Sequence, residues 1–224
     1  MSSFVLKIIA IITMFIDHLG YAIFGKFSYF NYIGRLSFPI FAFQISEGYI
    51  HTKNLKKYFL RLFLFALVSQ IPYMLFHSII SNGFYLNIFF TLLIGLLSIY
   101  IYDKCKYKFL GIILSIFLAL IAQYSHCDYG AYGVAIILIF YMFKNNIITS
   151  NIFFILATSI RYFLPCIRSG IFPKEYLYLF TFTIISTFFF AAYNGKKGKD
   201  TKYLLYLFYP IHLILIYGIY LILN

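Results

Sequence analysis

The feature that most constrains this chain is a series of long apolar runs separated by short polar or basic connections. Residues 62–76, for example, read LFLFALVSQIPYMLF without a charged side chain. Hydrophobic residues fill 63% of the 224 positions and charged residues 11%, against about 25% charged residues in a soluble domain. A soluble globular fold is therefore excluded. A transmembrane β-barrel is disfavoured because its strands alternate apolar and polar side chains, whereas these runs are apolar on every side.

The number of runs predicts how often the chain crosses a membrane. A bilayer core of about 30 Å needs about 20 apolar residues per helix, so nine helices would use roughly 180 residues. We predict an all-α, polytopic membrane helix bundle of about nine transmembrane helices, with a range of about eight to ten, in one integral membrane domain over 1–224. The region 109–143 is the least certain, because its runs are short. The predicted spans are 5–25, 31–50, 57–76, 84–102, 109–123, 130–143, 150–165, 177–193 and 203–223.

The net charge of +12 comes from basic residues in the connections, and their distribution predicts an orientation. The N-terminal end and alternate connections hold thirteen of the 18 Lys and Arg residues, and the opposite side holds five. By the positive-inside rule the N-terminus is cytoplasmic and, with nine spans, the C-terminus is outside. The thirteen are Lys7, Lys53, Lys56, Lys57, Arg61, Lys104, Lys106, Lys108, Lys144, Lys196, Lys197, Lys199 and Lys202.

Composition narrows the possible partners and the host. The basic clusters are not interleaved with aromatic residues on a soluble face, so no nucleic acid is expected as a partner. Cys105, Cys127 and Cys166 are odd in number and have no metal-ligand spacing, so neither a disulfide framework nor a metal site is expected. Abundant Phe, Ile, Tyr, Lys and Asn with no Trp suits an A/T-rich bacterial genome. We therefore predict a bacterial cytoplasmic membrane protein.

Ionisable side chains inside the predicted spans point to function. Each costs on the order of 3 kcal/mol at the centre of a spanning helix, and such residues usually face a bundle interior or an aqueous cavity. Asp17 and His18 lie in the first span, Arg35 and Glu47 in the second, and His212 in the last. Their concentration in three spans favours a single reaction centre.

Helical geometry predicts how these side chains are arranged. Lys7 and His18 are eleven residues apart, which returns to nearly the same helix face about 16 Å further along the axis. Asp17 and His18 are adjacent and point about 100° apart, so Asp17 is poorly placed to orient its neighbour. Arg35 is the first candidate to pair with Asp17, because both lie in the outer half of the bundle.

The second span carries a polar stripe that runs toward the cytoplasm. Gln44, Glu47 and His51 stand at i, i+3 and i+7, and Glu47 is expected to meet Lys57, Arg61 or Lys7.

Structural interpretations of all these residues stay open. His18 can be a buried histidine satisfied by a neighbouring helix, and Asp17 with Arg35 a structural ion pair. The stripe can be a helix end reaching water, and His212 can cap a carbonyl freed by Pro210.

Several blocks of the sequence together resemble the TraX family of membrane proteins. The two most specific blocks are LKIIAIITMFIDHLG at 6–20 and IGRLSFPIFAFQISEGYIHT at 33–52. Gln70 departs from the pattern, because the family often has glutamate there. The remaining blocks follow in the family's order and are KKYFLRL at 56–62, SQIPY at 69–73, NIFFTL at 87–92, DYG at 128–130, YNGKKG at 193–198 and FYPIHL at 208–213.

The resemblance implies an activity. TraX is associated with N-terminal acetylation of conjugative pilin in the inner membrane, which implies acetyl-CoA as donor and an amino group as acceptor. The Lys7-x10-His18 spacing also resembles the Arg-x10-His pattern of type-3 membrane acyltransferases, with lysine in place of arginine. Lysine keeps the charge but lacks the bidentate fork of arginine.

We predict a membrane-embedded, acetyl-CoA-dependent acyltransferase that acts on an amine- or hydroxyl-bearing acceptor such as a pilin-like peptide. His18 is the base, since imidazole titrates near neutrality. His212 is a second base, an acyl carrier or an oxyanion donor. Asp17 and Arg35 complete the predicted catalytic group, in which Arg35 stabilises the oxyanion or balances Asp17. The residues predicted to bind the acyl-CoA are Lys7, Glu47, His51, Lys56, Lys57, Arg61 and Lys197.

Two other functions and two chemical routes stay open. Intramembrane Asp, Glu and His also mark proton-coupled transporters, although the chain lacks the two repeated halves that such proteins often show. A non-catalytic assembly factor would use the charges only to register helices. Direct transfer and an acyl-histidine intermediate are both compatible with the sequence.

Overall fold

A computed structural model describes residues 1–199 and 203–223, and only the backbone of Leu205. Lys202, one of the thirteen basic residues predicted to be cytoplasmic, lies outside the described residues. The chain divides into two compact units, each built from segments that are separate in the sequence. Unit 1 comprises Met1–Phe41, Pro72–Gly83 and Thr158–Asn224, and unit 2 comprises Ala42–Ile71 and Phe84–Ala157. The single domain over 1–224 stays a prediction.

The part of the chain that the structure describes is helical, which confirms the predicted all-α bundle. Nine helices have 13 or more residues and one, α2, has six. In chain order they are α1 (Ser3–Phe24), α2 (Tyr29–Gly34), α3 (Ser37–His51), α4 (Leu55–His77), α5 (Ile88–Lys104), α6 (Lys108–Tyr124), α7 (Gly130–Met142), α8 (Ile147–Ser169), α9 (Lys174–Ala191) and α10 (Leu204–Leu223).

Four of the described helices are long and apolar enough to cross a membrane by themselves. These are α1, α4, α8 and the segment Tyr206–Leu223 of α10. Helices α6 and α7 are apolar but shorter. Several such helices in one chain make a multi-pass membrane protein, whereas the count of nine spans and the cytoplasmic N-terminus stay predictions.

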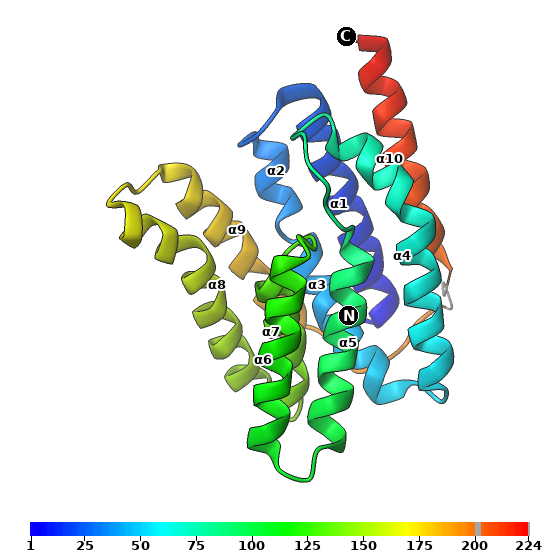
Figure 1. Ribbon diagram of the computed structural model, residues 1–224, viewed down its shortest axis with the longest axis vertical. Helices are drawn as coiled ribbons and strands as arrows, with labels where there is room; N and C mark the ends of the chain where they lie inside the picture. The colour runs from blue at the N-terminus through cyan, green and yellow to red at the C-terminus, as the bar shows by residue number, and fades with distance from the viewer. Residues whose placement is uncertain (200–202, 224) are drawn as a thin grey trace. The chain divides into compact units, whose positions relative to one another are not determined.

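In unit 1, α1 packs against α2 and α10, and α2 packs against α9. Figure 1 shows α1 in blue beside α10 in red. Ser2 caps α1 by accepting a hydrogen bond from the Val5 N–H, and the helix ends at Gly25, whose φ of +73° favours glycine. The buried face of α1 recurs every three or four residues, as one face of a helix requires. It includes Leu6, Ala10, Thr13, Asp17 and Gly20.

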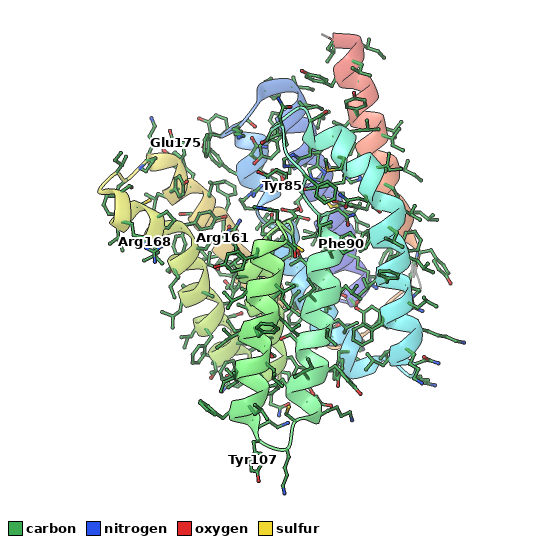
Figure 2. The ribbon with its side chains drawn as sticks, in the orientation of Figure 1. Tyr85, Phe90, Tyr107, Arg161, Arg168 and Glu175 are labelled. Carbon is green, nitrogen blue, oxygen red and sulfur yellow. The ribbon has the colours of Figure 1, made fainter. Side chains whose placement is uncertain are left out.

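In unit 2, α5, α6 and α7 pack against one another. Tyr107 projects from the turn that joins α5 to α6 (Figure 2). At the other end of these helices a short parallel bridge pairs Leu86 with Cys127. The Leu86 N–H donates to the His126 carbonyl at 3.1 Å, and the Asp128 N–H donates to the Leu86 carbonyl at 2.9 Å. The bridge ties the start of α5 to the α6–α7 connection.

The predicted span 31–50 is wrong as a single helix. The chain forms α2, breaks at Arg35 and Leu36, and starts again as α3. Pro39 explains the break, because its ring would clash with the carbonyl of Arg35 in a continuous helix. In the first turn of α3, by contrast, proline is tolerated, since the N–H it lacks would have no helical partner there.

The predicted start of the span 84–102 is also wrong by four residues. Residues 84–87 are not helical, and α5 begins at Ile88 after the N-cap Asn87. Asn87 accepts a hydrogen bond from the Phe89 N–H at 3.0 Å through its side-chain oxygen. An apolar run therefore marks the helix, but the capping side chain decides where it begins.

Candidate functional site

Two predicted site residues from opposite ends of the chain meet in unit 1. Nδ1 of His18 on α1 lies 2.7 Å from Nε2 of His212 on α10, although the residues are 194 positions apart. Nδ1 of His212 lies 2.9 Å from the carbonyl oxygen of Phe208, one turn earlier in the same helix. Pro210 would leave the carbonyl of Tyr206 without a helical donor, not that of Phe208. The interpretation of His212 as a cap for the carbonyl freed by Pro210 is therefore wrong.

Aromatic rings enclose the histidine pair. The His18 ring lies 4.7 Å from the Phe76 ring, and the His212 ring stacks on Phe208 at the same centroid distance with an angle of 10° between the planes. Phe15 and Tyr209 are the next rings, 6.4 and 5.6 Å from His212. His212 is 1% exposed, while His18 is only partly buried. The two imidazoles therefore share one apolar environment but differ in access.

Asp17 and Arg35 form the expected ion pair. Nη2 of Arg35 donates to both carboxylate oxygens of Asp17 at 2.8 and 2.7 Å. Asn31, which sequence reasoning missed, donates to the backbone carbonyl and to Oδ1 of Asp17 at 3.0 and 3.3 Å. It also accepts from the N–H and hydroxyl of Ser28. Asp17 makes no hydrogen bond to either histidine among the described residues, so its catalytic role stays a prediction.

A small residue lets α2 approach this ion pair. Gly34 ends α2, and a Cβ atom built there would overlap the side chain of Asp17. The close contact between α1 and α2 thus depends on glycine at this position. The sequence signal for this network was the presence of Ser28, Asn31, Gly34 and Arg35 in the short segment directly after α1. These residues come to lie beside Asp17 when α2 folds back against α1.

Two of the predicted acyl-CoA contacts, Lys7 in α1 and Lys197 after α9, lie near the N-terminal end of α1. The N–H groups of Ser3 and Phe4 donate to the carbonyls of Lys196 and Lys197 at 2.8 and 3.1 Å. The basic segment after α9 is thereby held against the start of α1, one turn before Lys7. Lys7 and His18 both lie in α1, so about 16 Å of helix axis separates them. This end of unit 1 brings together Lys7 and Lys197.

The other predicted acyl-CoA contacts lie in unit 2, where α3 ends and α4 begins. Glu47 pairs with His51 at 3.4 Å, one helical turn away. The expectation that Glu47 meets Lys57 or Arg61 is wrong, because within a helix the i+4 residue lies on the same face and is the nearest base. A contact with Lys7, which lies in unit 1, stays a prediction. The backbone N–H of Lys57 donates to the Asn54 side chain at 2.9 Å, which caps α4.

Arg61 carries a buried donor without a partner. Its guanidinium lies over the Tyr58 ring, 5.7 Å from the centroid. Nε of Arg61 is buried and has no hydrogen-bond partner among the described residues. An unsatisfied buried donor on a charged group costs about 1–3 kcal/mol or more, so an anionic ligand oxygen would stabilise this arrangement.

A second polar cluster, in unit 2, was not predicted. Asp103 at the end of α5 accepts from the hydroxyl of Tyr49 at 2.8 Å and from that of Tyr141 at 2.6 Å. Three helices, α3, α5 and α7, therefore meet at one carboxylate. The available signal was a single acid directly before the basic residues Lys104, Lys106 and Lys108.

A groove in unit 2 does not coincide with any predicted site residue. It has a volume of about 440 Å³ and a lining without polar side chains, formed by Phe59, Leu60, Phe63, Leu93, Ile94 and Leu97. An all-apolar lining offers no group for acid–base chemistry. The histidine pair in unit 1 is therefore the better candidate for a reaction centre.

Comparisons with known proteins agree with the residue blocks. The family described as TraX protein matches residues 2–220. A curated relative, the probable fimbrial assembly protein FimC of serogroup H1 from Dichelobacter nodosus, is 33% identical over 232 residues, covering 96% of this chain and 94% of the relative. No solved structure matches the chain at a significant level. By the family match over nearly its whole length, the chain belongs to the TraX family.

Proposed function

We propose that this chain is a membrane-embedded acyltransferase that transfers an acetyl group from acetyl-CoA to an amino group of an exported or membrane-associated substrate. One observation carries the proposal: two hydrogen-bonded imidazoles, His18 and His212, lie within an aromatic enclosure of a multi-pass membrane protein. Burying polar side chains in a membrane protein is costly, so a buried polar pair there usually has a function. Acyl transfer needs a base of this kind.

The chemistry assigned to His18 is proton transfer. As the acceptor nitrogen attacks the thioester carbon, a C–N bond forms and His18 takes the proton of the amine. When the tetrahedral intermediate collapses, the C–S bond breaks, and His18 returns that proton to the departing thiolate. Acetyl-CoA supplies an activated acyl group, so neither an oxidant nor a metal takes part in this balance.

The basic residues at two places suit the phosphates of an acyl-CoA. In unit 2 the buried, unpartnered Nε of Arg61 is a donor that a phosphate oxygen would satisfy, and Lys57 lies one turn away on α4. In unit 1, Lys7 and Lys197 lie at the end of α1 that precedes His18. Glu47 and His51 stay proposed contacts, since their mutual contact leaves the His51 side chain largely exposed.

The Asp17–Arg35 pair holds α1 and α2 together around the histidine-bearing turn. Because the carboxylate neutralises the guanidinium, the pair adds no net charge to the enclosure. Arg35 is proposed to stabilise the oxyanion, and Asp17 to hold the guanidinium in place.

The acceptor is proposed to be the amino terminus of a pilin-like polypeptide. The TraX family match and the relative's name, a probable fimbrial assembly protein, both support a role in the assembly of surface filaments. An N-terminal amine is a nucleophile once it is deprotonated, and its free pKa of about 8 lies within reach of an imidazole base.

A direct assay tests the proposal. Purified protein in lipid nanodiscs is incubated with radiolabelled acetyl-CoA and a peptide that has a free N-terminus, and we expect label in the peptide. His18→Ala should abolish transfer while the protein stays folded. His126→Asn is the matched control, because His126 lies in the α6–α7 connection with a positive φ of 51° that asparagine accepts. It should retain activity.

Three results would overturn the proposal. Failure to label peptide, sugar or lipid acceptors argues against an acyltransferase. Substrate flux into proteoliposomes that lack CoA would identify a transporter. A normal cell phenotype with His18→Ala and Glu47→Ala, together with loss of function in a deletion strain, would identify a non-catalytic assembly factor.

A further inference from the structure

We propose that His212 is a positioning residue that fixes the proton arrangement of His18, so that Nε2 of His18 is the reacting atom. The inference rests on the proposed function, and it decides between roles that the sequence leaves open. From sequence, His212 is a second base, an acyl carrier or an oxyanion donor. The donor and acceptor pattern of the pair favours none of these.

The carbonyl of Phe208 determines the tautomer of His212. A carbonyl oxygen can only accept a hydrogen bond, so Nδ1 of His212, 2.9 Å away, must carry a proton. A neutral imidazole has one N–H, and its other nitrogen is an acceptor. Nε2 of His212 is therefore a lone pair directed at His18.

The tautomer of His18 follows from that of His212. Nδ1 of His18 lies 2.7 Å from Nε2 of His212 and must donate, because the partner nitrogen has no proton. The lone pair of neutral His18 is then at Nε2. No residue in the described part of the chain bonds to this nitrogen. The Phe208 carbonyl thus fixes the tautomer of His212, and His212 in turn fixes that of His18. The free lone pair is the one on Nε2 of His18.

The exposure of the two histidines supports the same assignment of roles as their hydrogen bonds do. His212 is 1% exposed, stacks on Phe208 and uses both nitrogens in hydrogen bonds. It has no nitrogen left to attack a thioester or to donate to an oxyanion. His18 keeps partial exposure and one unused nitrogen. If an acyl-histidine forms, it therefore forms on Nε2 of His18.

The pair also explains how His18 could hold a proton in an apolar site. When Nε2 of His18 takes the proton of the acceptor amine, the bond from Nδ1 to His212 becomes charge-assisted and stronger. The Nδ1 proton can then shift to Nε2 of His212, which moves the positive charge onto the buried ring of His212. The proton later returns to His18 along the same hydrogen bond. A carboxylate in this position, as in the serine protease triad, would instead leave a charge in the resting site.

A substrate-free measurement tests the proton arrangement. Protein with ¹⁵N-labelled histidine in detergent is studied by long-range ¹H–¹⁵N correlation NMR at a pH where the pair is neutral. The signals are assigned with single His→Gln variants. We expect the Nδ1–H tautomer for both His18 and His212. An Nε2–H tautomer at His212 would overturn the inference, whether or not the protein proves to be an acyltransferase.

Kinetics of two variants test the positioning role. His212→Gln retains an acceptor that can face Nδ1 of His18, whereas His212→Leu removes it. We expect His212→Leu to lower kcat about 100-fold with KM unchanged, as for a displaced catalytic group, and His212→Gln to restore most of the loss. Equal kcat values for the two variants, or a change confined to KM, would contradict the proposal.

A trapping experiment tests the acyl-carrier role. The protein is incubated with labelled acetyl-CoA and no acceptor, quenched, digested, and its peptides are analysed by mass spectrometry. An acetylated His212 would overturn the inference, and an acetylated His18 or no acetylated histidine would agree with it. If transfer fails in the wild type, the proposed function fails, and the NMR result alone decides the proton arrangement.

Discussion

The carboxylate of Asp17 shows how a single acid is tolerated inside this bundle. It is 7% exposed, and both of its oxygens accept from Arg35 while Asn31 binds one of them. Removing one member of a buried pair leaves an uncompensated charge, which is far worse than replacing both. The contribution of Asp17 or Arg35 to stability therefore depends on whether its partner is present.

Breaking the pair from either side should destabilise the protein strongly. We expect Asp17→Asn and Arg35→Gln each to lower the free energy of unfolding by about 3–5 kcal/mol. The double variant should lose about 1–3 kcal/mol less than the sum, because the residues contact each other. Denaturant titration in detergent, followed by circular dichroism, measures all three. Additivity within about 0.5 kcal/mol would show that the pair contributes no coupling.

Cys127 should be unreactive at neutral pH. Burial, with the nearby Asp128 carboxylate, raises the pKa of the Cys127 thiol to about 11. The thiolate is the nucleophile, and at pH 8 only about one thiol in a thousand would be ionised. In a Cys105→Ser/Cys166→Ser variant, the rate of maleimide labelling should rise about tenfold per pH unit up to pH of about 10. A plateau below pH 9 would contradict the assignment.

At the scale of elements, the start of α5 is fixed by a buried amide network in unit 2. Asn87 is fully buried, and its amide group donates to the Ala66 carbonyl and to the Gln70 side chain. Gln70 in turn donates to the Tyr85 carbonyl at 2.7 Å. Each amide uses its donor and its acceptor, so the network joins α4 to α5 without a charge.

Changing Asn87 should therefore cost more than loss of a helix cap. Asn87→Asp keeps the capping oxygen but loses both donors and sets a carboxylate against two acceptors. We expect Asn87→Asp and Asn87→Ala each to lower stability by about 2–3 kcal/mol. Asn54→Ala, which removes the exposed cap of α4, is the comparison, with about 1 kcal/mol expected. Thermal unfolding in detergent measures the difference, and equal losses at the two caps would contradict it.

At the scale of the whole molecule, the distribution of basic residues makes a prediction about orientation that the native cysteines can test. Cys105 lies in the α5–α6 turn among Lys104, Lys106 and Lys108, which the positive-inside rule places in the cytoplasm. Cys127 and Cys166 are buried. A membrane-impermeant maleimide should therefore label Cys105 in inverted vesicles and not in intact spheroplasts. Labelling in spheroplasts alone would reverse the predicted topology.

The helices of this protein could be predicted from the sequence because lipid leaves the backbone little choice. Without water to bond N–H and C=O groups, an apolar run of sufficient length must be helical. The partner of Asp17 was predictable as well, since Asp17 and Arg35 were both expected in the outer half of the bundle. Helix boundaries were less accessible: the break at Arg35 depends on Pro39, and the start of α5 on the cap Asn87.

By itself, the sequence determined the all-α class, the position of most of the apolar helices along the chain and the presence of titratable residues within them. Only the tertiary structure decided that His18 faces His212 and that Tyr49 and Tyr141 meet on Asp103. The physical reason is range. The hydrophobicity of a segment and the spacing of its side chains are local properties that can be read along the chain. A hydrogen bond between residues 194 positions apart depends instead on how separate helices pack.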